Sequence, residues 1–184
     1  MILKPAMCYD RVKSDFVIIT SSLERKKEKE YLKYLSYRDK LTELYNRNRY
    51  IELIDGLKGQ KLYRTGVAYI DLNGLKRVND QKGHEAGDRL IRNAAAVIND
   101  IFYDKVYRIG GDEFVVIFCE IDEQEFFDRM KILRERMNRE KISVSAGSIW
   151  KAEIDDLEKV LKSADSCMYE EKEEYYRVNK IYRR

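Results

Sequence analysis

Three carboxylates in the middle of this 184-residue chain could hold a metal ion. Asp71 closes an apolar run at residues 65–72, whereas Asp112 and Glu113 stand between two later strand-like runs. If the ends of these runs meet at one edge of a sheet, the carboxylates repel one another unless cations screen them. Hard oxygen ligands favour Mg²⁺, which proteins usually hold with carboxylates and substrate phosphates. Each residue alone is more simply an exposed turn carboxylate, but the set predicts a divalent-cation site.

A glycine pair, Gly110-Gly111, separates the two later strand-like runs. This pattern is a strong hairpin signal, because the favoured two-residue turn needs positive φ at both central positions. The missing side chains would also let a phosphate chain approach the backbone. Because side chains alternate along a strand, Asp112 and Glu113 should enter the same metal shell only if the hairpin is distorted.

A polar segment at residues 73–88 follows the first apolar run and could recognise a base. In the simplest interpretation, Asn79 forms a turn and Asp88 opens a helix, where its charge interacts with the helix dipole. A carboxylate can also accept hydrogen bonds from the ring N–H and exocyclic amine of guanine, while an amide pairs with the remaining polar edge. His84 lies between them, and its position alone is more typical of a structural or surface histidine.

The elements that must position these residues follow the order β-α-β-β-α-β. This order is the ferredoxin-like split βαβ arrangement, an antiparallel sheet with helices on one face. The last helix is expected to pack alongside, with Asp155 or Asp156 as its cap. Apolar runs predict strands at residues 65–72, 105–109, 113–119 and 142–150, and helical periodicity predicts helices at residues 47–58, 86–101, 123–139 and 155–173.

Composition disfavours several classes of function. The chain has 36 Lys and Arg against 33 Asp and Glu, and the two signs are interspersed rather than gathered in the basic stripe of a nucleic-acid binder. Its three cysteines form no CxxC pair, which disfavours a disulfide framework or a zinc site and is typical of reduced thiols. No apolar stretch approaches the ~20 residues of a membrane helix, and the start of the chain does not resemble a signal peptide. We therefore expect a cytoplasmic chain, although it can be a fragment of a longer membrane-bound protein.

The N-terminal part of the sequence leaves two interpretations open. Residues 15–20 could form a strand, with Ser21-Ser22 capping a highly charged helix at residues 23–38. That helix is either a solvated surface helix or a connector that pairs with its copy in a dimer.

Residues 108–114, with the sequence RIGGDEF, resemble the signature of the GGDEF family of diguanylate cyclases. Glu43 replaces a usual glycine in the opening block of that family, and Asn73 replaces a frequent second aspartate after the metal strand. Other blocks resemble the family in the expected order, so that the resemblance spans residues 37–173; these blocks lie at residues 39–47, 69–73, 79–88, 143–147 and 164–172.

This resemblance implies an α/β (more narrowly α+β) palm fold, as in nucleotidyl cyclases. It also implies an enzyme that condenses two GTP molecules into cyclic di-GMP with release of pyrophosphate. Residues 37–177 would form the cyclase domain and residues 178–184 a short tail. Residues 1–36 would be an N-terminal segment and connector helix, which could form the end of an upstream sensor. Neither nucleic acid nor a membrane is expected as a partner of this chain.

The family also implies roles for the polar residues. Asp71, the Leu72 carbonyl and Asp112 would hold Mg²⁺ or Mn²⁺. Asp112 is the usual candidate for deprotonating the attacking 3′-hydroxyl, and Glu113 is the alternative. The residues that would contact the nucleotide are Asn79, His84, Asp88, Lys76, Arg108, Gly110, Gly111 and Lys172.

Because cyclic di-GMP is two-fold symmetric, a homodimer with one GTP in each domain is the expected catalyst.

Many members of the family carry an RxxD product-inhibition motif just before the hairpin. In this chain the motif aligns with residues 101–104, where Ile101 replaces the arginine and Asp104 is kept. Isoleucine cannot grip phosphate as the planar fork of arginine does, so we expect no product binding there. After Lys172 the family's arginine is one position out of register, at Arg177.

Two other interpretations of the function stay open: a GGDEF domain that binds GTP or partners without turnover, and a related palm-type cyclase or polymerase fragment.

Overall fold

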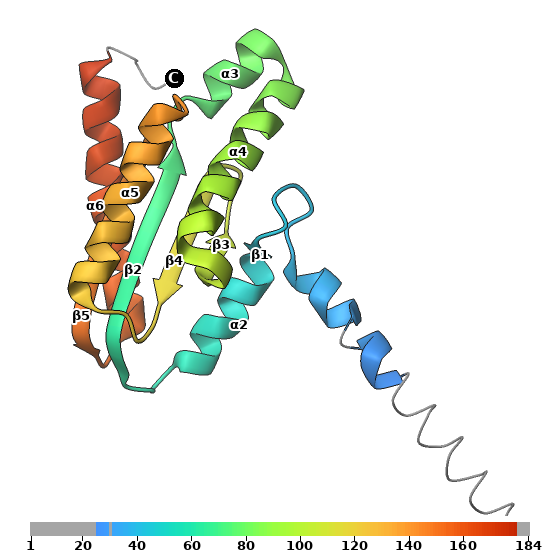
Figure 1. The fold of residues 1–184 in the computed structure, drawn as a ribbon, viewed down its shortest axis with the longest axis vertical. Coiled ribbons are helices and arrows are strands. Elements are labelled where there is room, and N and C mark those ends of the chain that lie inside the picture. Colours follow the sequence, from blue (N-terminus) through green and yellow to red (C-terminus); the bar gives the residue numbers. More distant parts are fainter. Residues whose placement is uncertain (1–24, 30, 180–184) are drawn as a thin grey trace, which may run out of the picture. The chain divides into compact units, whose positions relative to one another are not determined.

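The computed structural model describes residues 25–29 and 31–179 (Figure 1). The chain divides into one unit that ends at Tyr37 and a second that begins at Arg38. In the first unit, residues 25–29 and 31–37 are helical, in agreement with the charged helix expected there. The strand expected at residues 15–20 and the cap at Ser21-Ser22 lie outside the described residues.

In the second unit, the described strands form one mixed five-stranded sheet in the order β1-β3-β4-β2-β5. The central strand β2 is antiparallel to both β4 and β5, and β3 is antiparallel to β4. The short edge strand β1 is parallel to β3 and was not predicted. The strands are β1 (Tyr45–Asn46), β2 (Leu62–Leu72), β3 (Val106–Arg108), β4 (Glu113–Phe118) and β5 (Val144–Ile154).

Helices cover both faces of this sheet (Figure 1). Helices α4 and α5 pack on one face, while α2 and α6 pack on the other. The predicted α/β fold with its βαββαβ order is confirmed, and the two helices of that motif, α4 and α5, lie on one face as expected; α2 and the final helix α6 cover the other face. The helices are α2 (Arg47–Leu57), α3 (Leu75–Lys82), α4 (His84–Phe102), α5 (Glu123–Arg139) and α6 (Leu157–Val178).

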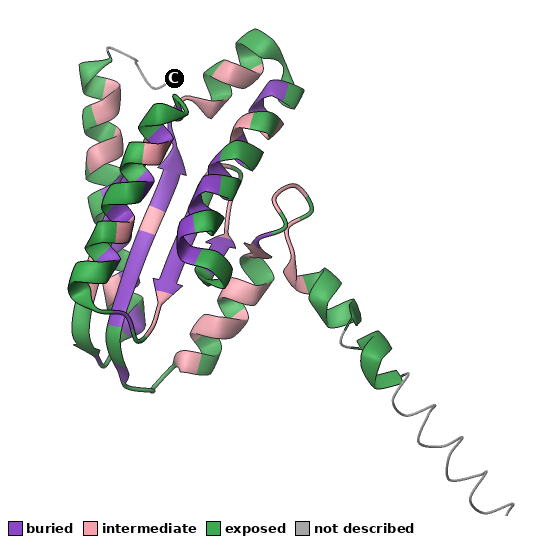
Figure 2. Cartoon of the chain, viewed as in Figure 1, coloured by how far each residue is buried: buried purple, intermediate pink, exposed green. Residues whose placement is uncertain are grey.

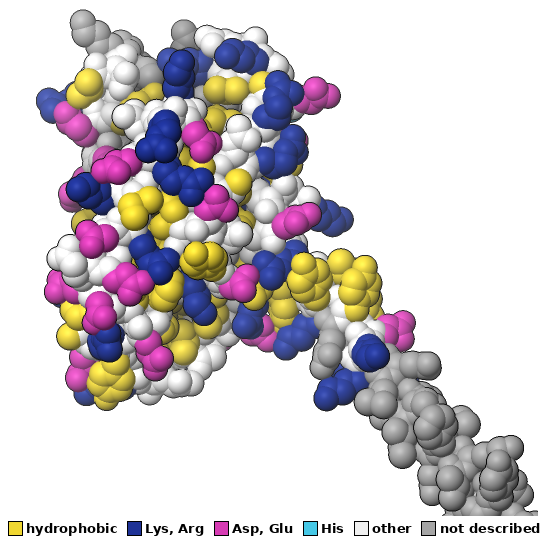
Figure 3. Space-filling model, viewed as in Figure 1, with side chains coloured by type: hydrophobic (Ala, Val, Ile, Leu, Met, Phe, Trp, Pro, Cys, Tyr) yellow, Lys and Arg dark blue, Asp and Glu magenta, His cyan; other side chains and the backbone are white. Residues whose placement is uncertain are grey.

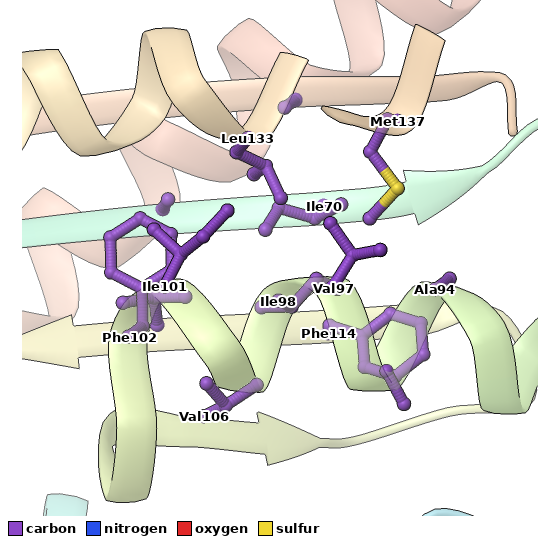
Figure 4. Packing of buried hydrophobic residues seen from close by; sticks show 14 of the residues in the cluster. Ile70, Ala94, Val97, Ile98, Ile101, Phe102, Val106, Phe114, Leu133 and Met137 are labelled. Atoms are coloured by element: carbon purple, nitrogen blue, oxygen red, sulfur yellow. The ribbon is translucent and has the colours of Figure 1, made fainter. Parts of the chain in front are cut away.

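Strand β2 is buried along most of its length because it carries apolar side chains on both faces (Figure 2). Ile70 and its alternate neighbours face α4 and α5, whereas Val67 belongs to the cluster under α2 and α6. Figure 4 shows side chains of β2, α4 and α5 meeting around Ile70, among them Val97 and Leu133. A strand held on both sides in this way fixes the position of its last residues, where Asp71 lies.

Gly147 of β5 lets α6 approach the sheet closely. A Cβ atom at this position would lie 2.0 Å from the backbone oxygen of Ala164 and 2.4 Å from the backbone nitrogen of Met168. Real Cβ atoms do not come so close to backbone atoms, so glycine is required at this crossing. The contact sets the height of α6 over the sheet and therefore the position of the residues on its later turns.

Some details differ from the sequence-based expectations. Phe127, which lies in the helix expected to present its aromatic residues inward, is 40% exposed. Cys119 and Cys167, the cysteines within the described part of the chain, form no disulfide. Among the described helices, none combines the length and apolar character needed to cross a membrane.

Candidate active site

Asp71 is a buried carboxylate near the end of β2. Its side chain is only 2% exposed, and its Oδ2 accepts a hydrogen bond from Lys172 Nζ of α6 at 2.5 Å. Its Oδ1 is buried and has no hydrogen-bond partner among the described residues. Burial raises the pKa of Asp71 to about 6, although the hydrogen bond from Lys172 opposes this shift. A buried carboxylate oxygen without a donor is a position that a cation can occupy.

Asp112 and Glu113 lie at the same edge of the sheet as Asp71. Glu113 is the cross-strand partner of Asp71, and the backbone oxygen of Asp112 accepts a hydrogen bond from Leu72 N at 3.1 Å. The charges of both carboxylates add to the burial that raises the pKa of Asp71. Because β4 begins only at Glu113, Asp112 belongs to the preceding loop, and the alternation of strand side chains does not apply to it.

The loop between β3 and β4 is longer than the predicted two-residue turn. Residues 109–112 separate the strands, and the loop closes with a hydrogen bond from Ile109 N to Glu113 O at 3.0 Å. Neither Gly110 nor Gly111 has positive φ, so the expected two-residue turn is wrong. The longer loop reverses the chain without that backbone conformation.

The two glycines provide space instead. A Cβ atom on Gly110 would lie 2.3 Å from Glu113 Oε2, so the Glu113 carboxylate folds against this residue. A Cβ atom on Gly111 would meet nothing within 4 Å. The backbone at Gly111 is therefore open to a ligand.

Arg108 connects the loop at residues 109–112 to Asp39. Its guanidinium donates from Nη1 to Asp39 Oδ1 at 2.7 Å and from Nη2 to the carbonyl oxygen of Gly111 at 2.8 Å. Burial opposes ionisation of Asp39, but hydrogen bonds from Arg108 and Thr42 keep the pKa of Asp39 below its usual value. The structure thus ties the predicted nucleotide contact Arg108 to the segment at residues 39–42, a pairing that sequence reasoning did not foresee.

The predicted guanine-reading residues lie on α3 and α4. The segment at residues 75–82 is helical, although its polar composition had suggested turns. Helix α4 begins at His84, so Asp88 lies one turn inside the helix and does not open it. Asp88 and Asn79 are half-buried, whereas Lys76 and His84 are exposed.

Asn79 is held against the start of α4. A Cβ atom on Gly87 would lie 1.9 Å from Asn79 Oδ1, so the absence of a side chain at Gly87 makes room for this amide. Asn79 Oδ1 is buried and has no hydrogen-bond partner among the described residues. Asn79 Oδ1 is therefore an acceptor without a donor, and it lies against Gly87, the neighbour of Asp88. Such an acceptor suits the recognition of a donor on a bound base.

Positive side chains gather near these residues. Figure 3 shows several dark blue side chains over α3 and the first turns of α4, with a magenta side chain beside them, and both signs over the rest of this face. The exposed positive residues on α3 and the first turns of α4 include Lys76, Arg77, Lys82 and Arg89. The exposed acidic residues there are Asp80 and Glu85. This arrangement would attract a polyphosphate without forming the extended stripe of a nucleic-acid binder.

The donors at the edge of the sheet fit a magnesium ion. Within the part of the chain that the structure describes, no three or more His, Cys, Asp or Glu side chains form a metal-binding group by themselves. Mg²⁺ needs fewer protein ligands than that, because it keeps waters and binds substrate phosphates. The unpartnered oxygen of Asp71 meets this requirement, and Asp112 and the Leu72 carbonyl stay predicted ligands beside it.

Asn73, which stands where the family often has an aspartate, turns away to β5. It is buried, its Nδ2 donates to Ser143 Oγ at 3.2 Å, and its Oδ1 accepts from Ser145 Oγ at 3.0 Å. These bonds use the amide to tie β2 to β5. In this conformation the side chain at position 73 points toward Ser143 and Ser145, so asparagine in place of aspartate removes no ligand from the predicted metal site.

The model of the diguanylate cyclase GGDEF domain matches residues 36–177. The chain belongs to the GGDEF family. This membership places it among proteins of cyclic di-GMP signalling, as the resemblance of its motifs had implied.

Named relatives include proteins of both synthesis and breakdown. The chain is 31% identical over 147 residues to "Diguanylate cyclase DosC" of Shigella sonnei, covering 71% of this chain and 32% of that protein. It is 31% identical over 166 residues to "Cyclic di-GMP phosphodiesterase PdeR" of Escherichia coli, covering 84% of this chain and 25% of that protein. The chain thus spans a third or less of the length of these GGDEF relatives.

Solved GGDEF structures share the fold. The coiled coil and GGDEF domain of DgcB from Caulobacter crescentus, solved in complex with cyclic di-GMP, aligns with a TM-score of 0.71 and 24% identity. The alignment covers 88% of this chain and 94% of that one. At this identity the likeness bears on the fold.

Proposed function

We propose that this chain is a diguanylate cyclase that condenses two GTP molecules into cyclic di-GMP with release of two pyrophosphates, in the presence of Mg²⁺ or Mn²⁺. The observation that carries the proposal is the unpartnered Oδ1 of Asp71 at an edge that it shares with Asp112 and Glu113. The proposed cyclase domain is residues 37–177, preceded by an N-terminal segment and connector helix at residues 1–36 and followed by a tail at residues 178–184.

In the proposed reaction, the 3′-oxygen of one GTP attacks the α-phosphorus of the other, and the bond to the pyrophosphate leaving group breaks. When bound, Mg²⁺ supplies positive charge for the triphosphate and for the developing charge on the reacting oxygens. Asp112 accepts the proton of the 3′-hydroxyl, and Glu113 is the alternative base. The backbone at Gly111 faces open space and admits the phosphate chain, and Lys76 balances its charge.

Guanine recognition is assigned to Asn79 and Asp88. Asp88 accepts hydrogen bonds from the ring N–H and the exocyclic amine, and the Asn79 amide lies beside it against Gly87. His84 is exposed at the start of α4 and stays a proposed neighbour of the base. Adenine lacks the paired donors that a carboxylate accepts, so this arrangement favours GTP over ATP.

Each domain binds one GTP, so a single chain cannot close both new phosphodiester bonds. A homodimer in which two domains face each other is therefore proposed as the active form, in keeping with the two-fold symmetry of the product. The rate per chain should then rise with protein concentration until the dimer is saturated.

The experiment is product detection from purified protein with GTP and MgCl₂. We expect cyclic di-GMP and pyrophosphate in a one-to-two ratio, and a loss of about 10²-fold or more in Asp112→Asn and in Asp71→Asn. Asp128→Asn, on the exposed face of α5, is the matched control and should keep wild-type activity. Wild-type activity in Asp71→Asn, or no product from a verified dimer, would refute the proposal.

A second candidate is a GGDEF domain that binds GTP without turnover. The engagement of Arg108 by Asp39 and the Gly111 carbonyl favours it, because this cation is then not offered to the phosphates. GTP binding by calorimetry in a dimer that yields no product would identify this second function.

A further inference from the structure

Lys172 and Asp71 form an ion pair at the proposed metal site. The Lys172 side chain is 14% exposed and Asp71 is 2% exposed, so water screens this pair poorly. The pair joins α6 to the end of β2, and its hydrogen bond spans 101 positions of sequence. The ammonium therefore occupies one oxygen of the carboxylate that the proposed reaction needs for Mg²⁺.

The packing of α6 brings Lys172 to this position. Gly147 allows the backbone of α6 to lie against β5 at Ala164 and Met168. Met168 is buried, and Lys172 follows it by four residues, so both project from the same face of the helix. The lysine reaches Asp71 through a flexible four-carbon stem, which can move its charge without moving the helix.

An ammonium has three donors and no acceptor, so it must always face an anion or water. If a metal ion alone bound Asp71 at Oδ1, the Lys172 ammonium on Oδ2 would be held in a largely buried position beside a divalent cation, and both would compete for the charge of one carboxylate. If the metal arrived with a triphosphate, the same ammonium would find a new anion within reach of its stem.

We infer that Lys172 is the resident counter-cation of Asp71 in the nucleotide-free protein, and that its transfer from Asp71 to the triphosphate couples metal binding to nucleotide binding. The inference rests on the proposed function. It makes metal binding weak when nucleotide is absent and strong when nucleotide is present. By linkage, the metal strengthens nucleotide binding by the same factor.

The test measures Mn²⁺ affinity without nucleotide, by electron paramagnetic resonance at about pH 8, where carboxylates are ionised. Lys172→Gln removes the competing charge, while its amide can still donate to Asp71. We expect about tenfold tighter Mn²⁺ binding, the lower end of the effect that a close charge has on a carboxylate. Lys172→Arg keeps the charge and should resemble the wild type, as should Lys162→Gln, an exposed lysine of the same helix.

The same variants are then titrated with a non-hydrolysable GTP analogue in saturating Mn²⁺. Lys172→Gln should bind the analogue about tenfold more weakly, because the phosphates lose a charged partner. Opposite signs for metal alone and for nucleotide would not arise from a general loss of structure.

A second measurement needs no variant. Acetylation of lysine amines in the wild-type protein, followed by mass spectrometry, should speed up at Lys172 when Mn²⁺ is added without nucleotide, and should stay constant at Lys162. An unchanged rate at Lys172 in Mn²⁺-saturated protein, or unchanged Mn²⁺ affinity in Lys172→Gln, would overturn the inference. If the protein makes cyclic di-GMP while either of those results holds, the inference alone fails. If no form binds Mn²⁺ even with the analogue, the proposed metal-dependent function fails with it.

Discussion

Gly87→Ala should separate the stability of this protein from its recognition of guanine. The added methyl group would lie 1.9 Å from Asn79 Oδ1, whereas ordinary van der Waals contacts begin at 3.4 Å. To restore an ordinary contact, one of the two groups must move by about 1.5 Å. The Asn79 amide moves, because it is the end of a flexible side chain, whereas the backbone of α4 is held rigidly by packing. A displacement of this size is enough to break a hydrogen bond to a bound base.

The expected loss follows from that hydrogen bond. A binding partner left without its acceptor costs about 1–3 kcal/mol, which weakens GTP binding by about 5- to 150-fold. Folding stability should change little or rise, because alanine is favoured over glycine inside a helix by up to about 1 kcal/mol. Gly56→Ala is the matched control, since Gly56 lies in α2 and a Cβ atom there would meet nothing within 4 Å.

The assay combines calorimetric titration of a GTP analogue with urea denaturation of the metal-free protein. Gly56→Ala should keep wild-type affinity. Asn79→Ala should lose as much affinity as Gly87→Ala, and the double variant should lose no more than either, since both act through one amide. Wild-type affinity in Gly87→Ala would refute the role given to Asn79.

Three further outcomes follow from the same structure. Gly147→Ala places a Cβ atom 2.0 Å from a backbone oxygen of α6 that cannot rotate away, so urea denaturation should show a loss of about 1–3 kcal/mol; an unchanged midpoint would contradict the packing described. The pKa of Asp71 rises from 3.8 to about 6 on folding, so the metal-free folded state binds more protons between these values and its stability falls as pH increases through this window. Asp71→Asn should remove this fall in stability. Identical profiles of stability against pH for the wild type and Asp71→Asn would contradict the raised pKa of Asp71. Ile101 cannot bind a phosphate, so calorimetry should show the same cyclic di-GMP affinity in wild type and Asp104→Ala; tight binding lost in the variant would reveal a product site.

The sequence predicted most of the sheet and its helices because apolar periodicity reports directly on burial. Helix α5 begins and ends at the predicted residues, Glu123 and Arg139. Helix α3 was missed because none of its residues is fully buried and its polar side chains resemble those of a turn. The short strand β1 has only two residues, too few for any periodicity.

The site was predicted as a set of residue types more readily than as a set of contacts. Asp71, Asp112 and Glu113 do share one edge, because strand order alone brings them together. The loop at residues 109–112 could not be foreseen, since its length is set by where pairing of β3 with β4 stops. The bond from Arg108 to Asp39 joins segments 69 positions apart, and no local pattern in either segment indicates the other.

The central claim is that a divalent cation binds where Asp71 meets the loop that carries Asp112. The most direct measurement is a crystal structure with a non-hydrolysable GTP analogue and Mn²⁺, in which anomalous scattering locates the metal. The account predicts Mn²⁺ in contact with Asp71 Oδ1 and Asp112, the triphosphate along Gly111, and the Lys172 ammonium moved from Asp71 to a phosphate. Manganese and triphosphate bound away from Asp71, with the Lys172 pair intact, would contradict it.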